Sequence, residues 1–139
     1  MKFCPPKLKH SLKSFTLAEV LVVLIIIGIL VLLVLPNLMP LITKAKSTEA
    51  KVQLEYVHTL EKSFYYEHSK YSKDLNEINY EQQKLNTEGG QANYKIDIIE
   101  VTETGFKARA TSVTDFDGDG VYNVWEIDQD KKLTEVVKD

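Results

Sequence analysis

The sequence predicts an α+β fold in which a long N-terminal helix packs against a small antiparallel sheet of about four strands. Three observations support this prediction. Residues 15–35 are apolar except for Glu19, residues 41–70 repeat apolar side chains with helical spacing, and residues 94–139 change to a period of two. A chain of 139 residues has room for one small domain plus such an apolar extension.

The apolar segment is long enough to cross a membrane. Its 21 residues would rise about 1.5 Å each, which matches a hydrocarbon core about 30 Å thick. Residues 1–14 carry four lysines and no acid, and basic flanks remain cytoplasmic. We therefore expect a transmembrane helix over residues 15–40, which the family resemblance described below would also place in a filament core. The alternative is a secretory signal cut after its apolar core, but that core is usually 7–15 residues long and ends at a small-x-small site.

The charge of the remaining chain limits its partners. Residues 15–139 carry 13 basic and 20 acidic side chains, so we expect no binding of nucleic acid through the overall electrostatic field of the protein. Cys4 is the only cysteine, which excludes an intrachain disulfide. No Ser/His/Asp order, phosphate loop or pair of catalytic carboxylates stands out, and we expect no enzymatic role.

Residues 41–70 are predicted to form an amphipathic helix that continues the apolar one. Pro36 and Pro40 are expected to kink or loosen the junction, because proline removes a backbone donor and crowds the preceding turn. We expect the apolar arc to face the sheet and the charged side chains to lie opposite. The predicted arc contains Ile42, Ala45, Val52, Tyr56, Leu60 and Phe64, with Val57 beside it, and the opposite side contains Lys44, Lys51, Glu55 and Lys62.

The C-terminal part is predicted to be a sheet of strands in hairpin succession. A polar variable loop over residues 71–93 leads into it. One face of such a sheet would pack on the helix, and the other could face water. The predicted strands are residues 94–98, 106–110, 122–127 and 133–137.

The start of the apolar segment resembles the processing signature of type IV pilins and of the related type II secretion pseudopilins. Two positions depart from that signature. Ser14 stands where the family usually has glycine, and Ala18 stands where isoleucine is the commonest residue. Gly28 and Pro36 also fall at family spacings. The resemblance is specific over residues 13–40, and beyond them it rests on architecture. The matching residues are Lys13, Ser14, Phe15, Thr16, Leu17, Ala18 and Glu19.

The resemblance implies a role for each of these positions. A prepilin peptidase would remove residues 1–14 by cutting between Ser14 and Phe15, and would methylate the new amino group of Phe15. Glu19 would pair with the N-terminal amine of a neighbouring subunit, which offsets the cost of a carboxylate in lipid. The alternative for Glu19 is a favourable interaction with the helix dipole in the first turn. Gly28 and Pro36 would mark a segment that loosens on assembly, although both residues are tolerated in any membrane helix.

The resemblance also implies partners and a location. The subunit would be stored in the inner membrane in contact with lipid, with its C-terminal domain extracytoplasmic. An inner-membrane assembly platform would then build it, with copies of itself and other pilin-like subunits, into a helical filament. That filament would be a pilus at the cell surface or, as the alternative, a periplasmic secretion pseudopilus. An alternative of another class is a single-pass anchored calcium-binding protein that does not polymerise.

Residues 115–126 match the spacing of an EF-hand loop, with acids at the first, third and fifth places and glutamate at the twelfth. The predicted strand over residues 122–127 opposes this reading, because an extended chain would carry Glu126 away from the loop. Trp125 and Ile127 would then face the core and Glu126 would point outward.

A smaller calcium site within the same loop is the preferred prediction. Alternate carboxylates on a tight loop direct oxygen atoms at one hard cation, and they repel one another without it. The alternative is an acidic turn chosen for its backbone geometry alone. The predicted ligands of a structural Ca²⁺ are Asp115, Asp117, Asp119, the carbonyl of Val121 and, as an optional further ligand, Asn123.

Overall fold

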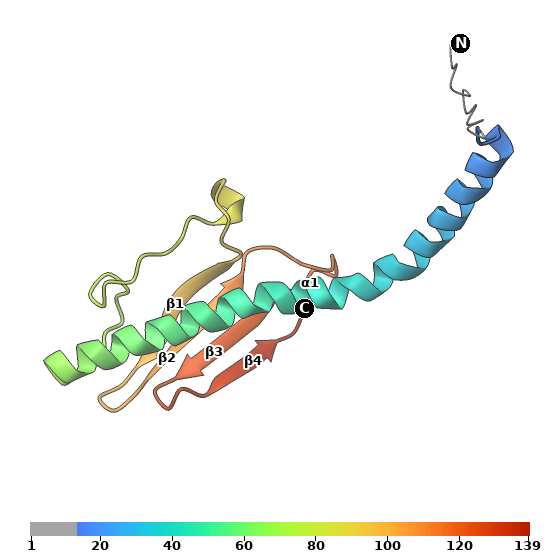
Figure 1. Ribbon diagram of the computed structural model, residues 1–139. Coiled ribbons are helices and arrows are strands. Elements are labelled where there is room, and N and C mark those ends of the chain that lie inside the picture. The colour runs from blue at the N-terminus through green and yellow to red at the C-terminus, as the bar shows by residue number, and fades with distance from the viewer. Residues whose placement is uncertain (1–13) are drawn as a thin grey trace, which may run out of the picture. The chain divides into compact units, whose positions relative to one another are not determined.

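The computed structural model describes residues 14–139 and divides the chain into two units, Met1–Asn37 and Leu38–Asp139 (Figure 1). Each unit is described by itself. The predicted leader, apart from Ser14, lies outside the described residues. The elements are helix α1 (Leu17–His68), the short 3-10 helix η1 (Asn86–Glu88), and four strands, β1 to β4.

In the first unit, α1 presents an apolar surface on all sides. Residues Leu17–Pro36 form a helical segment long and apolar enough to cross a membrane, and none of it is buried. Pro36, near the end of this unit, is a helical residue of α1, as is Pro40 in the second unit. A lipid-spanning helix would have this composition, since every backbone group is satisfied within the helix and only side chains meet the surroundings.

In the second unit, α1 buries a different face from the one predicted. Ala50, Leu54 and Val57 are fully buried, whereas Val52 and Tyr56 are 60% and 51% exposed. The predicted arc is wrong by about a third of a turn at these positions. The physical reason is that the buried stripe also contains the polar residues Ser47 and Glu61, which the apolar pattern could not include. Of the predicted arc, Leu60 and Phe64 are partly buried against the core and its neighbour Val57 is fully buried.

The sheet has the predicted antiparallel succession, in the order β1-β2-β3-β4. Irregularities in the register interrupt β1–β2 pairing between Ile98 and Glu100, and β3–β4 pairing between Val124 and Trp125. The strands are β1 (Tyr94–Val101), β2 (Phe106–Ser112), β3 (Val124–Asp128) and β4 (Leu133–Val137). The α+β prediction is confirmed, and β3 begins two residues later than predicted.

One face of the sheet packs on α1, which crosses it in Figure 1. Alternate residues of β2 are buried, and Trp125 and Ile127 of β3 join them in the core, as predicted. The intervening side chains of these strands remain partly exposed. This alternation is the expected result of a period of two on a sheet with one solvated face.

The connection between α1 and β1 packs against the open edge of β1. The side-chain amide of Gln82 donates to the carbonyl of Tyr94 at 3.1 Å and accepts from the backbone N–H of Ile96 at 2.9 Å. Ile78 and Tyr80 of the same connection are buried in the core. The predicted variable loop is therefore an ordered layer over one edge of the sheet.

Candidate assembly and metal sites

Glu19 lies in the first turn of α1 and bonds to the residue that precedes the helix. The backbone N–H and the hydroxyl of Thr16 both donate to Glu19 Oε2, at 2.8 and 3.1 Å. In return the backbone N–H of Glu19 donates to the Thr16 hydroxyl at 3.3 Å. This reciprocal arrangement is a capping box, in which the N-cap and third helical residues satisfy otherwise unpaired N–H groups.

The capping box gives Glu19 a local partner that the sequence interpretation missed. The signal was present, because threonine followed three positions later by glutamate before an apolar run is the usual signature of such a cap. The two bonds to Thr16 engage one carboxylate oxygen, Oε2. The arrangement can therefore anchor the helix start and still present negative charge to another group.

The other predicted assembly residues lie along the same unit. Ser14 and Phe15 precede α1, and the Phe15 side chain is 82% exposed. Gly28 lies in the middle of the apolar segment, where a methyl group in place of its hydrogen would meet no atom within 4 Å apart from its chain neighbours and the nearby backbone of its own helix. Pro36 ends that segment. In the unit as described, Gly28 is thus not required by close packing.

The aspartate loop before β3 is held by its own carboxylates. Asp115 accepts the backbone N–H groups of Gly118 and Gly120, both at 2.6 Å. Asp117 accepts from Asp119, and Asp119 accepts from Val121, at 3.1 and 2.7 Å. Gly118 and Gly120 adopt φ values of 84° and 87°, which residues other than glycine rarely adopt.

The structure joins a third carboxylate to the loop from the end of the chain. Oxygen atoms of Asp115, Asp117 and Asp139 lie within 4.8 Å of one another. Asp139 also accepts the backbone N–H of Phe116 at 2.9 Å. Asp119, which was predicted as the third acid, is not in this group. The spacing in sequence gave no signal for Asp139, because only the pairing of β3 with β4 brings it to the loop.

The protonation of the loop reflects this crowding of negative charge. The N–H donor of Gly120, followed by further backbone donors, holds the pKa of Asp115 below its usual value. The N–H donor of Asp119 lowers the pKa of Asp117. Desolvation and the nearby carboxylates of Asp119, Asp139 and Asp115 outweigh this bond, so that the pKa of Asp117 is raised above its usual value. A cation bound among Asp115, Asp117 and Asp139 would relieve that repulsion.

Asn123, the optional predicted ligand, has a different place. Its side chain is fully buried, and its amide nitrogen donates to Glu135 Oε1 at 2.8 Å and to the carbonyl of Val137 at 3.0 Å. Its amide oxygen accepts from the Tyr94 hydroxyl at 2.7 Å. The structure therefore does not bring the Asn123 side chain to the aspartate group. Val121 follows that group in the loop and is exposed.

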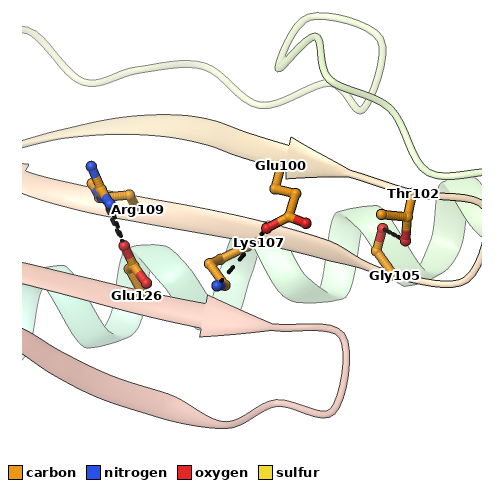
Figure 2. A network of polar contacts seen from close by, with 6 residues as sticks. All are labelled: Glu100, Thr102, Gly105, Lys107, Arg109 and Glu126. Atoms are coloured by element: carbon orange, nitrogen blue, oxygen red, sulfur yellow. Dashed lines mark hydrogen bonds and ion pairs between the residues drawn. The ribbon is translucent and has the colours of Figure 1, made fainter.

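Glu126, the twelfth residue of the EF-hand pattern, lies on β3 between the buried residues Trp125 and Ile127, on the opposite face of the sheet from them. It pairs with Arg109 on β2, as Figure 2 shows. The same view includes the exposed pair Lys107–Glu100 at 3.9 Å and the bond from the Thr102 hydroxyl to the carbonyl of Gly105. The prediction that Glu126 faces outward is confirmed.

Glu61 is a polar residue that the sequence interpretation did not single out. Its side chain is fully buried, and Oε2 accepts the backbone N–H of Ser72 at 3.1 Å. Oε1 has no hydrogen-bond partner among the described residues. Desolvation, opposed by the bond from Ser72 and reinforced by the charge of Glu77, raises the pKa of Glu61 to about 7.

Comparison with known proteins supports the resemblance to type IV pilins. No protein-family model matches the chain. The chain is 38% identical over 77 residues to the type IV major pilin protein PilA of Myxococcus xanthus (strain DK1622). The matched stretch covers 55% of this chain and 35% of that relative. This similarity to a type IV major pilin and the apolar helix Leu17–Pro36 are consistent with one another.

Proposed function

We propose that the chain is the structural subunit of a type IV pilin-like filament. The observation that carries the proposal is the apolar segment Leu17–Pro36, which has one carboxylate in its first turn and no buried residue within its own unit. A surface of this kind requires lipid or other apolar helices around it. Similarity to a major pilin favours lipid around this helix before assembly and copies of the same helix around it afterwards.

In the proposed maturation, a prepilin peptidase cuts between Ser14 and Phe15 and methylates the new amine of Phe15. That amine would lie about one helical turn from Glu19. Pairing of Glu19 with the amine of a neighbouring subunit would then join adjacent helices, because an ion pair in apolar surroundings is tolerated only when both partners are in place. Gly28 and Pro36 would let the segment loosen as the subunit leaves the bilayer. N-terminal sequencing that finds an intact leader in cells would contradict the maturation step.

The capping box makes a sharp test of Glu19 possible, because capping and charge can be separated. Glu19→Gln keeps a side chain that can accept from Thr16 but removes the negative charge. Glu19→Ala removes both. We expect both variants to insert in the membrane, and both to lose most filaments in electron microscopy and in the sheared surface fraction. Glu103→Ala, in the exposed β1–β2 turn, is the matched control and should assemble normally.

The outcomes distinguish the proposed pair from its alternative. Normal filaments from Glu19→Gln but not from Glu19→Ala would show that Glu19 acts only as a helix cap. Normal filaments from both variants would contradict any assembly role. Loss of membrane insertion would mean that the residue acts before assembly.

A second proposal concerns the aspartate loop, and it rests on the approach of three carboxylates. We propose that Asp115 and Asp117, with Asp139, hold a structural Ca²⁺. Oxygen ligands suit this hard cation, which takes six to eight of them and would complete its shell with backbone carbonyl groups such as that of Val121, with Asp119, and with water. The ion would fasten the end of the chain to the loop, where no disulfide can form.

A further inference from the structure

The connection between α1 and β1 is fastened to the helix at both ends by glutamates of α1. Near its beginning, Glu61 accepts the backbone N–H of Ser72 at 3.1 Å. At its end, Glu49 accepts the backbone N–H and the side-chain amide of Asn93, at 2.8 and 2.7 Å. Glu49 and Glu61 are 12 residues apart on one helix, so the two attachment points are separated by about 18 Å along it.

The two fasteners differ in their surroundings. Both oxygens of Glu49 accept hydrogen bonds, and the residue is partly exposed. Glu61 is fully buried and uses one oxygen, while Oε1 has no partner among the described residues. A buried carboxylate with an unpartnered oxygen strongly favours its neutral form, because the charge has neither water nor enough donors around it.

Among the described residues, no positively charged group pairs with Glu61, and His58, three residues earlier on α1, directs Nε2 to the carbonyl of Gln129 at 3.1 Å. From the connection, Glu77 accepts the hydroxyl of Ser72, so two carboxylates are linked through one serine. From α1, the neighbouring Lys62 directs its ammonium to the hydroxyl of Tyr71 at 3.1 Å. The sheet contributes apolar side chains to the core, Ile96, Ile98, Phe106 and Ala108 among them. Lys73 and Asp74 of the connection are exposed.

We propose that Glu61 is a pH-sensitive fastener for the start of the α1–β1 connection. Neutral Glu61 holds Ser72 and the buried Tyr71 against α1. Ionised Glu61 repels Glu77 and requires hydration, which it obtains when the turn over residues 72–77 opens. The end of the connection at Asn93 stays closed, since it depends on Glu49. The proposal concerns the folded domain and does not depend on filament assembly.

The direction of the effect follows from the chemistry. The raised pKa of Glu61 means that the closed turn binds a proton more tightly than the open turn does. Opening therefore releases a proton and becomes easier as pH rises. For a group that changes from about 7 when closed to its ordinary value of 4.5 when open, opening should increase about ten- to thirtyfold between about pH 5.5 and about pH 8.5.

Hydrogen exchange measured by mass spectrometry on the full chain in detergent micelles tests this proposal. After correction for the intrinsic pH dependence of exchange, peptides covering residues 72–80 should exchange about ten- to thirtyfold faster at the higher pH. Peptides covering residues 91–94 should show little change. Glu61→Gln, which cannot ionise, should keep residues 72–80 protected at both pH values. Glu49→Gln, the matched control, should loosen residues 91–94 and retain the pH response of residues 72–80.

Two results would overturn the proposal. The first is equal, corrected exchange of residues 72–80 at both pH values in the unmodified chain. The second is a pH response in Glu61→Gln that equals that of the unmodified chain. If Glu61→Gln does not fold, carbon-13 NMR of the Glu61 carboxyl group in the unmodified chain decides the matter. A titration midpoint near 4.5 would contradict the fastener, and a midpoint near 7 would support it.

Discussion

Arg109 on β2 and Glu126 on β3 lie directly opposite each other in the sheet, and the Nε and Nη2 atoms of Arg109 both donate to Glu126 Oε1, at 2.8 and 2.6 Å. The pair lies on the face of the sheet that does not pack on α1, with 41% of the arginine side chain and 15% of the glutamate side chain exposed. Glu126 is therefore occupied by a cross-strand partner. A twelve-residue EF-hand loop would need that same carboxylate as a ligand.

The calcium proposal predicts a stabilisation that depends on Asp117 but not on Glu126. Ligand linkage gives about 2.7 kcal/mol at a hundredfold excess over the dissociation constant, and 1 kcal/mol moves the midpoint of a domain this size by roughly 4–8 °C. If the site binds at about ten micromolar, millimolar calcium should raise the melting temperature of the full chain in micelles by about 10–20 °C over chelator. Asp117→Ala should remove most of this increase.

Two further variants separate the possible ligand sets. Asp139→Ala should weaken the calcium response, whereas Glu126→Ala should lower the melting temperature slightly in calcium and in chelator alike. A melting curve that does not respond to calcium or chelator would leave the loop as an acidic turn. Equal loss of the calcium response in Asp117→Ala and Glu126→Ala would instead support the full EF-hand loop.

The buried position of Asn123 predicts a large loss of stability that is independent of calcium. Asn123→Ala would leave the Tyr94 hydroxyl and the carbonyl of Val137 without their partner. Burial raises the pKa of Tyr94, so its hydroxyl remains a donor that needs an acceptor. We expect the free energy of unfolding to fall by about 2–3 kcal/mol in denaturant titrations. Thr134→Ala, on the exposed side of β4, should change it by less than about 0.5 kcal/mol.

The corrected face of α1 predicts different costs for two neighbouring apolar residues. Leu54 is fully buried and Val52 is 60% exposed. Leu54→Ala should therefore lower the free energy of unfolding by about 2–5 kcal/mol, because it leaves a cavity against the sheet. Val52→Ala should change it by no more than about 0.5 kcal/mol. Similar losses from both substitutions would favour the originally predicted arc.

The elevated pKa of Glu61 predicts that stability falls as pH rises. Between 4.5 and about 7 the folded chain retains a proton that the unfolded chain has released, so the favourable contribution is complete below 4.5 and is lost as pH approaches 7. A shift of this size corresponds to about 3 kcal/mol. Denaturant titrations across this range should show the decline in the unmodified chain, and Glu61→Gln should flatten it. A decline of equal size in Glu61→Gln would assign it to other groups.

Elements with a local signal could be predicted from the sequence, and those that depend on distant contacts could not. The alternation of apolar residues located all four strands, and the orientation of Trp125, Glu126 and Ile127 followed from the same period. The core face of α1 was misjudged because Ser47 and Glu61 are polar but buried. Their burial depends on contacts made after the chain folds, such as that between Glu61 and Ser72.

The candidate sites also differ in whether a local sequence signal could predict them. Thr16 and Glu19 are three residues apart, so their capping box could have been read from the sequence. Asp139 reaches the loop only through the pairing of β4 with β3. The side chain of Asn123 is instead bound in the core by Tyr94, which is 29 residues away in the sequence. Spacing within a loop could predict neither placement, because each depends on the register of the sheet.

The contacts of Gln82 with β1 limit how copies of this domain can associate when they are crowded together. The backbone groups along an uncovered strand edge are a template on which another chain can add a strand, and that is a common route to amyloid-like aggregation. At β1 the amide of Gln82 already occupies the N–H of Ile96 and the carbonyl of Tyr94. An incoming strand would have to displace it. Crowded domains are thereby protected from joining through this edge, and any ordered association must use other surfaces.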